Sequence, residues 1–175
     1  MAYILSMKLI NLSIILLLCS CIRPGNAKNK AKIVQGMAAS IQKQFADVAV
    51  IEAHEAIKLT AQKDSRTVLV DVREQKERNV SIIPGAISKA EFENRHLEFK
   101  NYQVIPYCTI GYRSSEYVRI LTQRGFKAYN LKGSILSWIH AGGTLIDKSG
   151  PTKKVHVFGE AWNFAPNDYQ AIYDN

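Results

Sequence analysis

Two apolar runs, with helical patterns after them, constrain the fold of this chain more than any other feature. Residues 67–72 are nearly continuous in β-branched and aliphatic side chains, and residues 103–107 form a second apolar run. Such runs are typical of strands in a parallel sheet that is buried on both faces. Helical patterns at residues 114–124 and 133–141 enclose a third strand candidate at residues 126–131. The alternation predicts an α/β fold with a central, mainly parallel sheet and helices on both faces.

The net charge of +8 is concentrated at the amino terminus. Five of the 23 basic side chains fall in residues 1–32, which hold no acidic side chain, and the remaining 18 are set against 15 acidic ones. A body so evenly charged does not resemble a nucleic-acid groove, in which lysines and arginines cluster on one face. We therefore expect no nucleic-acid partner. A chain of 175 residues has room for one core domain with tails.

The amino terminus has the pattern of a secretory signal peptide. Residues 9–18 form an apolar run behind Lys8, too short to cross a bilayer as a helix and suited to the core of a signal peptide. We interpret residues 1–20 as the signal, with Met7 as its start because a lysine then follows at once. The sequence thus predicts an exported protein.

Two processing sites are compatible with this signal. The residues before Cys21 resemble the lipobox of bacterial lipoproteins, with an aliphatic residue and two small residues ahead of the cysteine. Lipidation of Cys21 would anchor the protein to the membrane on the periplasmic side. Cleavage after Ala27 would instead release a soluble periplasmic protein. We favour the lipid anchor, and the mass of the mature amino terminus distinguishes the two.

Four segments follow the signal. We expect a basic tether at residues 21–32, an amphipathic helix at residues 33–46, the α/β domain at residues 47–147 and a carboxyl-terminal extension at residues 148–175. The extension has too many aromatic side chains for a disordered tail. These rings are Phe158, Trp162, Phe164, Tyr169 and Tyr173. We expect the extension to dock on the domain, where it covers the surface, shapes the entrance to the site or meets a protein partner.

Cys108 is the candidate nucleophile. The other two cysteines lie in the signal region, so the mature body has one internal thiol and forms no disulfide within its fold. Cys108 stands where a strand ends and a helix begins, so N–H groups without helical partners point toward it. Gly111 permits a positive φ, Arg113 adds a cation and Ser114 is a natural helix cap. These features favour a thiolate and predict a pKa for Cys108 below that of free cysteine.

This loop and its flanks resemble a single rhodanese domain. The matching stretches, in the order and spacing of that family, are residues 68–74, 83–87, 107–114, 125–126, 131–138 and 141–143. The family's cysteine takes a sulfane sulfur from a donor such as thiosulfate, holds it as a persulfide and passes it to a thiophilic acceptor. The resemblance implies a rhodanese-like fold and a thiosulfate sulfurtransferase, with a small anionic sulfur donor and a thiol or cyanide as acceptor.

The resemblance also assigns the site residues. Cys108 is the sulfur carrier, and six loop residues hold the persulfide and the anionic end of the donor. They are Thr109, Ile110, Gly111, Tyr112, Arg113 and Ser114. The chain departs from the family at residues 81–83, where Ser-Ile-Ile replaces the usual Gly-His-Ile. We expect this change to alter packing and to leave activity in place.

Asp71 and Arg73 are the supporting residues. We expect an ion pair between Arg73 and Glu77 that fixes the turn after the strand. We expect Asp71 to accept hydrogen bonds from backbone N–H groups near the loop. For both residues, lining the site is the alternative. The four histidines show no ligand spacing and no glycine-rich nucleotide loop occurs, so we expect neither a metal nor a cofactor.

Two other functions remain open. Some rhodanese-like domains are non-catalytic binding modules, but these often lack the cysteine that this chain keeps. Related phosphatases and arsenate reductases resemble a pattern in which five residues separate the nucleophilic cysteine from an arginine, whereas four residues separate Cys108 from Arg113. A tetrahedral oxyanion needs the wider loop, so the spacing favours sulfur chemistry.

Overall fold

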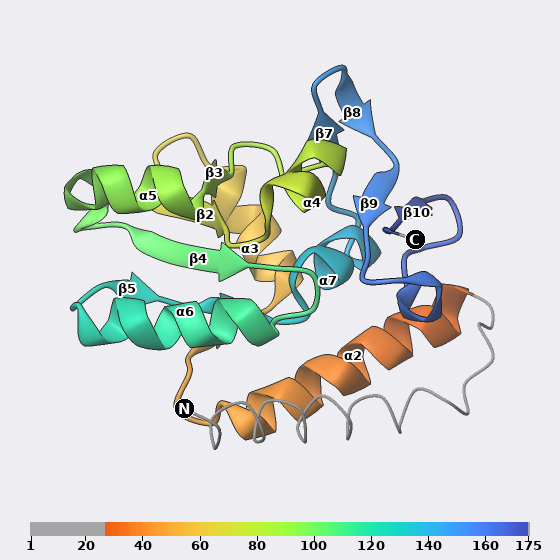
Figure 1. Ribbon diagram of the computed structural model, residues 1–175. Coiled ribbons are helices and arrows are strands. Elements are labelled where there is room, and N and C mark those ends of the chain that lie inside the picture. The colour runs from red at the N-terminus through yellow and green to blue at the C-terminus, as the bar shows by residue number, and fades with distance from the viewer. Residues whose placement is uncertain (1–26, 175) are drawn as a thin grey trace, which may run out of the picture.

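A four-stranded parallel sheet forms the centre of the computed structural model, which describes residues 27–174 (Figure 1). Its strands lie in the order β3 (Ile87–Ser88), β2 (Thr67–Asp71), β4 (Gln103–Tyr107) and β5 (Lys127–Ala128). These strands pair in parallel throughout. The expected mainly parallel sheet is confirmed.

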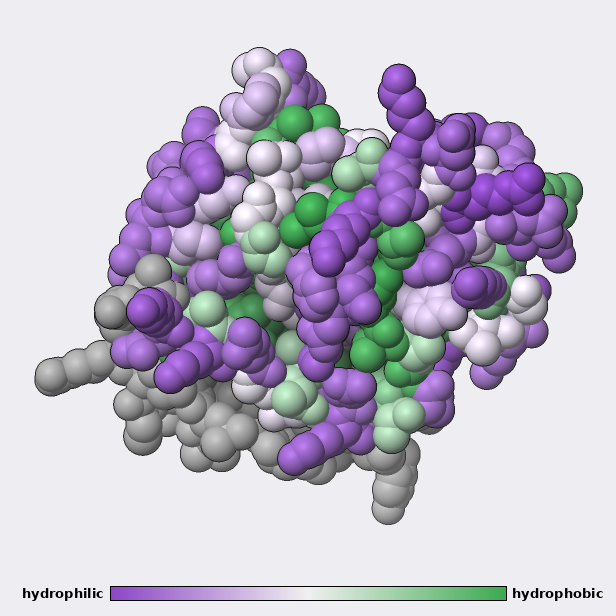
Figure 2. All heavy atoms as spheres, turned by 180° about the vertical axis from the view of Figure 1, so that it is seen from behind, coloured by the Kyte–Doolittle hydropathy of each residue, from purple (hydrophilic) through white to green (hydrophobic). Residues whose placement is uncertain are grey.

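Helices cover both faces of this sheet. α4 (Gln75–Val80) and α5 (Lys89–Arg95) lie on one side, and α6 (Tyr112–Gln123) lies on the other (Figure 1). α3 (Ala53–Thr60) packs against α7 (Ser134–His140). Hydrophilic residues cover most of the face opposite to that of Figure 1, with smaller hydrophobic areas between them (Figure 2). The predicted fold class, an α/β sheet with helices on both faces, is confirmed.

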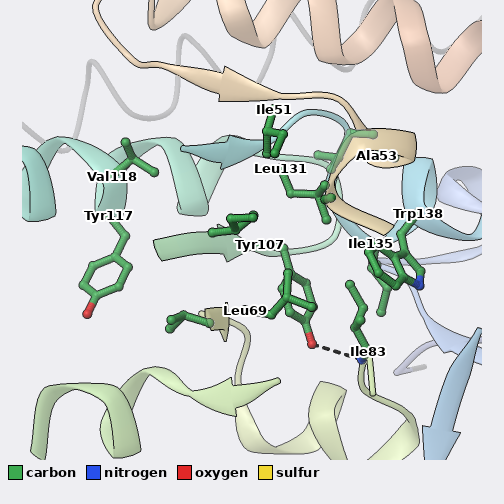
Figure 3. Packing of buried hydrophobic residues seen from close by; sticks show 14 of the residues in the cluster. Ile51, Ala53, Leu69, Ile83, Tyr107, Tyr117, Val118, Leu131, Ile135 and Trp138 are labelled. Atoms are coloured by element: carbon green, nitrogen blue, oxygen red, sulfur yellow. Dashed lines mark hydrogen bonds between the residues drawn. The ribbon is translucent and has the colours of Figure 1, made fainter. Parts of the chain in front are cut away.

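The hydrophobic core is continuous from the sheet into the helices. Val70 and Ile105, on neighbouring strands, have no solvent exposure. Tyr107, at the end of β4, is also buried, and its hydroxyl accepts a hydrogen bond from the backbone N–H of Ile83 at 3.2 Å (Figure 3). Trp138 of α7 belongs to the same cluster. The end of β4 is therefore fixed firmly where the loop of interest begins.

The third predicted strand, residues 126–131, is two short strands. β5 pairs with β4, whereas β6 (Asn130–Leu131) pairs in parallel with β1 (Val50–Ile51). Between them, the backbone N–H of Tyr129 still donates to the carbonyl of Val104 at 2.9 Å. The chain thus changes partner after Tyr129, and a run of apolar residues cannot reveal such a change.

Two short helices were not expected from the sequence. α4 begins with a capping box. The side chain of Glu74 accepts a hydrogen bond from the backbone N–H of Glu77, and the side chain of Glu77 accepts one from the backbone N–H of Glu74. Ser88 caps the start of α5, because its hydroxyl accepts a hydrogen bond from the N–H of Glu91 at 3.0 Å. The 3-10 helix η1 (His96–Phe99) follows α5. Both helices have few apolar residues, so periodicity did not indicate them.

The amphipathic helix begins earlier than predicted. α2 spans Ala27–Gln44, so the last part of the predicted tether is helical and not extended. Lys30 explains the difference, because it is only 9% exposed and its ammonium donates to the carbonyl of Ala165 at 3.0 Å. The buried side of the helix carries Val34 and Ile41. The rest of the tether lies outside the described residues.

The carboxyl-terminal segment folds against the domain. β7 (Leu145–Asp147) and β8 (Gly150–Thr152) are antiparallel, and β9 (Lys154–His156) pairs in parallel with β10 (Gln170–Ile172). β9 contacts α4, and the 3-10 helix η2 (Glu160–Trp162) lies next to the start of α2 (Figure 1). The rings in this segment are not equally buried. Phe164 is 4% exposed, whereas Phe158 is 55% exposed.

Within residues 27–174, no helix has the length and apolar character needed to cross a bilayer. The predicted signal peptide and the predicted lipidation site at Cys21 lie outside the described residues.

Candidate active site

Cys108 lies directly after β4, at the carboxyl end of a central strand. α6 begins at Tyr112, and the residue before it, Gly111, has a φ of 118° that favours glycine. Ser114 therefore lies inside the first turn of α6. The sequence had suggested that Ser114 caps this helix, and that prediction is wrong. The cause is the left-handed Gly111, which already turns the chain into the helix.

Hydrogen-bond donors surround the sulfur of Cys108, which is 2% exposed. The backbone N–H of Gly111 donates to Sγ at 3.1 Å, and the hydroxyl of Ser114 donates to it at 3.5 Å. Ser134, from the start of α7, contributes a third and longer contact of 3.9 Å. An anionic sulfur is thus solvated by the protein itself.

Sequence reasoning missed Ser134. Its hydroxyl accepts a hydrogen bond from the backbone N–H of Cys108 at 3.0 Å and lies 3.3 Å from the hydroxyl of Ser114. Ser134 has a φ of 50°, which is unusual outside glycine, and it follows the left-handed Gly133. The pair Gly133 and Ser134 at a helix start was the one hint in the sequence. No local pattern links this serine to Cys108, which is far away in the sequence.

Two further polar residues hold the loop in shape. The amide nitrogen of Asn130 donates to the carbonyl of Gly111 at 3.1 Å, and the hydroxyl of Ser115 donates to the same carbonyl at 2.8 Å. These two hydrogen bonds fix the carbonyl of Gly111, the residue whose N–H donates to the sulfur. Asn130 and Ser115 are buried. They are structural partners of the site that the sequence pattern did not indicate.

The remaining predicted loop residues have separate surroundings. Ile110 is 7% exposed and packs into the hydrophobic core. The ring of Tyr112 lies edge-on to Phe45, beside the end of α2, with 5.0 Å between centroids. The hydroxyl of Thr109 donates to Glu77 at 3.2 Å. Among the described residues, the hydrogen bonds to the sulfur do not include one from the side chain of Ile110, Tyr112 or Thr109.

Arg113 is paired with a buried carboxylate. Its Nη1 and Nη2 donate to the two oxygens of Glu77 at 2.7 and 2.8 Å. Glu77 lies on α4, and its side chain is 3% exposed. This pairing corrects the predicted ion pair between Arg73 and Glu77. The carboxylate of Glu77 is bound by Arg113 from α6, and the guanidinium of Arg73 binds Asp71 in its place.

Arg73 instead pairs with Asp71. Its Nη2 lies 2.7 Å from Asp71 Oδ2, with both side chains buried, and the backbone N–H of Arg73 donates to Asp71 Oδ1 at 3.0 Å. Arg73 Nη2 also donates to the carbonyl of Ser81 at 2.7 Å. Asp71 thus accepts from the backbone N–H of Arg73, two residues along the chain. This pair links the end of β2 to residues 81–83, and neither side chain contacts the sulfur of Cys108 in any hydrogen bond of the described residues.

The departure at residues 81–83 has a structural counterpart. Ile82 stands where the family usually has histidine, and its backbone forms an antiparallel bridge with Ile146 in β7. Ile82 N donates to Ile146 O at 2.9 Å. The substitution thus lies at the junction with the carboxyl-terminal segment.

The pKa of Cys108 results from opposing effects. Burial raises it, whereas the charge of Arg113 and the hydrogen bonds from Ser114 and Gly111 lower it, so that the pKa lies below its ordinary value. For Glu77, burial raises the pKa, but the hydrogen bond from Arg113 and the charges around it bring the pKa down to about 2. At neutral pH, Glu77 is ionised, and the lowered pKa gives Cys108 a larger thiolate fraction than a free cysteine has.

Acid should destabilise the protein through Glu77. A carboxyl group whose pKa falls from 4.5 to about 2 on folding contributes on the order of 3 kcal/mol. That stability is present above about pH 4.5 and is lost as the pH falls toward 2, because the unfolded chain takes up the proton first. Urea unfolding from pH 6 to pH 2 measures it. Glu77→Gln should show a shallower loss over this range, and equal slopes for both proteins would contradict the assignment.

An aromatic ring from the carboxyl-terminal segment lies over Arg113. The centroid of Phe158 is 5.2 Å from the guanidinium carbon, and the ring packs edge-on to Trp162 at 6.0 Å. With Phe45 on Tyr112, both segments that flank the α/β domain reach the Cys108 loop. The structure places the extension at the edge of the site.

Comparison with known proteins places this site in a family. The rhodanese-like domain model matches residues 52–141. A tRNA uridine(34) hydroxylase of Acholeplasma laidlawii is 33% identical over 110 residues, which cover 56% of this chain and 33% of that enzyme. The chain thus spans about a third of the length of that curated relative.

Solved structures show the same fold at lower identity. A thiosulfate sulfurtransferase of Pseudomonas aeruginosa is 23% identical with a TM-score of 0.53, covering 65% of this chain and 23% of that one. A protein of Rhodopseudomonas palustris, described as a possible tyrosine phosphatase, is 21% identical with a TM-score of 0.50, covering 63% of this chain and 91% of that one. Since the family model covers the two central strands and the complete Cys108 loop, the chain belongs to the rhodanese-like domain family.

Proposed function

We propose that the protein is a sulfurtransferase that carries a sulfane sulfur on Cys108. The observation that supports this most directly is the surroundings of the thiol. Its pKa is lowered, and the donors around Sγ come from Gly111, Ser114 and Ser134. A persulfide is also an anion at neutral pH, so the same donors suit the intermediate. Thiosulfate is the donor that the resemblance suggests.

The reaction consists of two displacements. The Cys108 thiolate attacks the outer sulfur of thiosulfate, the new S–S bond forms, and sulfite leaves with the electron pair of the old one. A thiophilic acceptor, cyanide or a thiol, then attacks the outer sulfur of the persulfide. The bond to Cys108 breaks, its electron pair returns to the cysteine, and thiocyanate or a new persulfide departs. No metal or organic cofactor takes part in either step.

Two alternatives have less support. A non-catalytic binding module has no need for a thiol with a lowered pKa. A phosphatase needs an arginine that is available to the phosphate oxygens, whereas both terminal nitrogens of Arg113 bind Glu77. The hydroxylase relative is about three times as long as the part that this chain covers, so its reaction on tRNA is not part of this proposal.

The proposal is tested with the wild-type protein. After incubation with thiosulfate, intact mass should increase by one sulfur atom, and peptide mapping should place it on Cys108. Addition of cyanide should release thiocyanate and restore the original mass. Hydrolysis of p-nitrophenyl phosphate without any sulfur loading would overturn the proposal in favour of a phosphatase. Absence of both reactions would favour the binding module.

A further inference from the structure

Glu77 connects α4 to two points of the Cys108 loop. Its carboxylate accepts from Nη1 and Nη2 of Arg113 at 2.7 and 2.8 Å and from the hydroxyl of Thr109 at 3.2 Å. Thr109 follows Cys108 directly, and Arg113 lies in the first turn of α6. Glu77 itself is fixed, because its carboxylate also accepts from the backbone N–H of Glu74 at 2.9 Å. A buried side chain from another helix thus holds the loop.

Stability alone does not account for the charge of Glu77. Its side chain is 3% exposed, and a carboxylate at such depth needs a counter-charge. Replacement of a buried ion pair by apolar side chains is often neutral for stability. What the pair does fix is the position of the guanidinium. The side chain of Arg113 is 28% exposed, and a long side chain so near to water keeps one position only where strong hydrogen bonds hold it.

Phe158 holds the guanidinium from a second side. Its ring centroid lies 5.2 Å from the guanidinium carbon of Arg113, and the ring packs edge-on to Trp162 at 6.0 Å. The segment that carries both rings is attached to the domain through β9, which contacts α4. Phe158 lies outside residues 52–141, which the family model matches, whereas Glu77 lies within them. The extension thus adds a contact to the arginine that the shared domain does not supply.

The position of Arg113 matters because its charge acts on the sulfur of Cys108. Burial raises the pKa of Cys108, and the charge of Arg113 is the largest of the effects that lower it. The N–H of Gly111 and the hydroxyl of Ser114 add to this at 3.1 and 3.5 Å. Those two donors lie close to the backbone of the loop, whereas the guanidinium lies at the end of a long side chain. Attraction between two charges weakens as they separate and as water enters between them.

We propose that Glu77 and Phe158 are positioning residues for the sulfur chemistry, because together they hold the guanidinium of Arg113 beside Cys108. The inference deepens the proposed function and rests on it for any effect on sulfur transfer. Both residues act through Arg113. A negative charge at Glu77 would by itself disfavour the thiolate, whereas a guanidinium held in place favours it. Loss of the charge and loss of the position therefore change the pKa of Cys108 in opposite directions.

The first test keeps the charge of Glu77 and moves it. Glu77→Asp withdraws the carboxylate by one carbon–carbon bond, about 1.5 Å, so that it no longer meets both terminal nitrogens of Arg113. Alkylation by iodoacetamide, measured on the peptide that carries Cys108 after reaction of the full chain at a series of pH values, gives the pKa. The midpoint should rise by about one pH unit. An unchanged or lower midpoint would overturn the role of Glu77.

Glu77→Ala separates position from charge. If the carboxylate acted only as a negative charge, its removal would lower the pKa of Cys108. If it holds Arg113, its removal raises the pKa by about one pH unit or more. The double variant Glu77→Ala with Arg113→Met should then agree with Glu77→Ala to within about 0.3 of a pH unit, because a displaced arginine contributes nothing further. A clearly higher midpoint in the double variant would show that Arg113 keeps its place without Glu77, which contradicts the inference.

Phe158→Ala tests the second contact without disturbing the buried pair, since the ring is 55% exposed. Loss of an exposed contact between a ring and a cation should raise the midpoint for Cys108 by about half a pH unit. Two controls should keep the wild-type midpoint. Leu97→Ala removes another exposed apolar side chain, and Glu74→Ala removes the other half of the α4 capping box. A wild-type midpoint in Phe158→Ala would exclude Phe158 as a positioning residue.

The outcomes separate this inference from the function on which it rests. Sulfur loading from thiosulfate should show the same change of pH profile in Glu77→Asp, because the thiolate is the reacting form in both measurements. If loading occurs but the midpoint rises in no variant, the positioning role is wrong and sulfur transfer stands. If the midpoints rise as expected but even wild type takes up no sulfur, the sulfurtransferase is wrong and the hold on Arg113 stands. If circular dichroism shows that Glu77→Ala does not fold, Glu77→Asp and Phe158→Ala decide.

Discussion

Cys108→Ser protein should lose sulfur transfer from thiosulfate to cyanide by about a thousandfold or more. A serine hydroxyl has nearly the same shape as the thiol, so the donors from Gly111 and Ser114 keep their places. The hydroxyl does not ionise near neutral pH, however, and it cannot form a persulfide. The effect is therefore chemical, and the measurement is the rate of thiocyanate formation.

The control for this variant is Ser134→Ala. It keeps the nucleophile and removes the hydroxyl that contacts the sulfur and accepts from the N–H of Cys108. One hydrogen bond to a charged group corresponds to about a tenfold loss of rate. Thermal unfolding should show that Cys108→Ser is as stable as wild type to within about 1 kcal/mol. A transfer rate in Cys108→Ser equal to that of wild type would exclude Cys108 as the carrier.

Asp71→Ala should lower the free energy of unfolding by about 3–5 kcal/mol. The side chains of Asp71 and Arg73 are almost fully buried, and Arg73 donates from Nε to Asp71 Oδ1 at 2.9 Å and from Nη2 to Asp71 Oδ2 at 2.7 Å. Removal of the carboxylate leaves a guanidinium in the core without its counter-charge. Arginine remains protonated in proteins, so the guanidinium cannot become neutral instead. Urea unfolding at neutral pH measures the loss.

Asp47→Ala is the matched control for the buried pair. Asp47 forms an ion pair with Arg119, but the side chains are 59% and 41% exposed. Loss of such a surface pair costs about 1 kcal/mol or less, because water solvates the remaining arginine. If Asp71→Ala were no more destabilising than Asp47→Ala, the Asp71 and Arg73 pair would not hold the end of β2 as the structure indicates.

The two central strands beside the Cys108 loop could be predicted, because buried strands consist mainly of apolar residues. β2 and β4 have apolar interiors, and the sequence predicted both at nearly the correct bounds. β5 and β6 were predicted as one strand, because a change of pairing partner after Tyr129 depends on distant residues. α4 was missed since its first turn is stabilised by polar side chains. The start of α2 was missed since Lys30 finds its acceptor 135 positions away.

The candidate site likewise has a part that the sequence predicts and a part that only the structure shows. Cys108, Gly111 and Arg113 are adjacent in sequence, so their spacing and chemistry indicated a loop that stabilises an anion. Ser134 is 26 residues from Cys108, and Glu77 is 36 residues from Arg113. Only the parallel sheet brings these residues together. The sequence suggested the wrong partner for Glu77, because Arg73 is close to Glu77 along the chain whereas Arg113 reaches it only through the fold.

The contact between Lys30 and Ala165 joins two segments that lie on opposite sides of the matched domain in sequence. Phe45 follows the first segment, and Phe158 belongs to the second, and each reaches a different residue of the Cys108 loop. A fragment trimmed to the borders of the family match would keep the nucleophile but expose Tyr112 and Arg113 to water. Substrate preferences measured on such a fragment would describe the shared domain and not the whole chain.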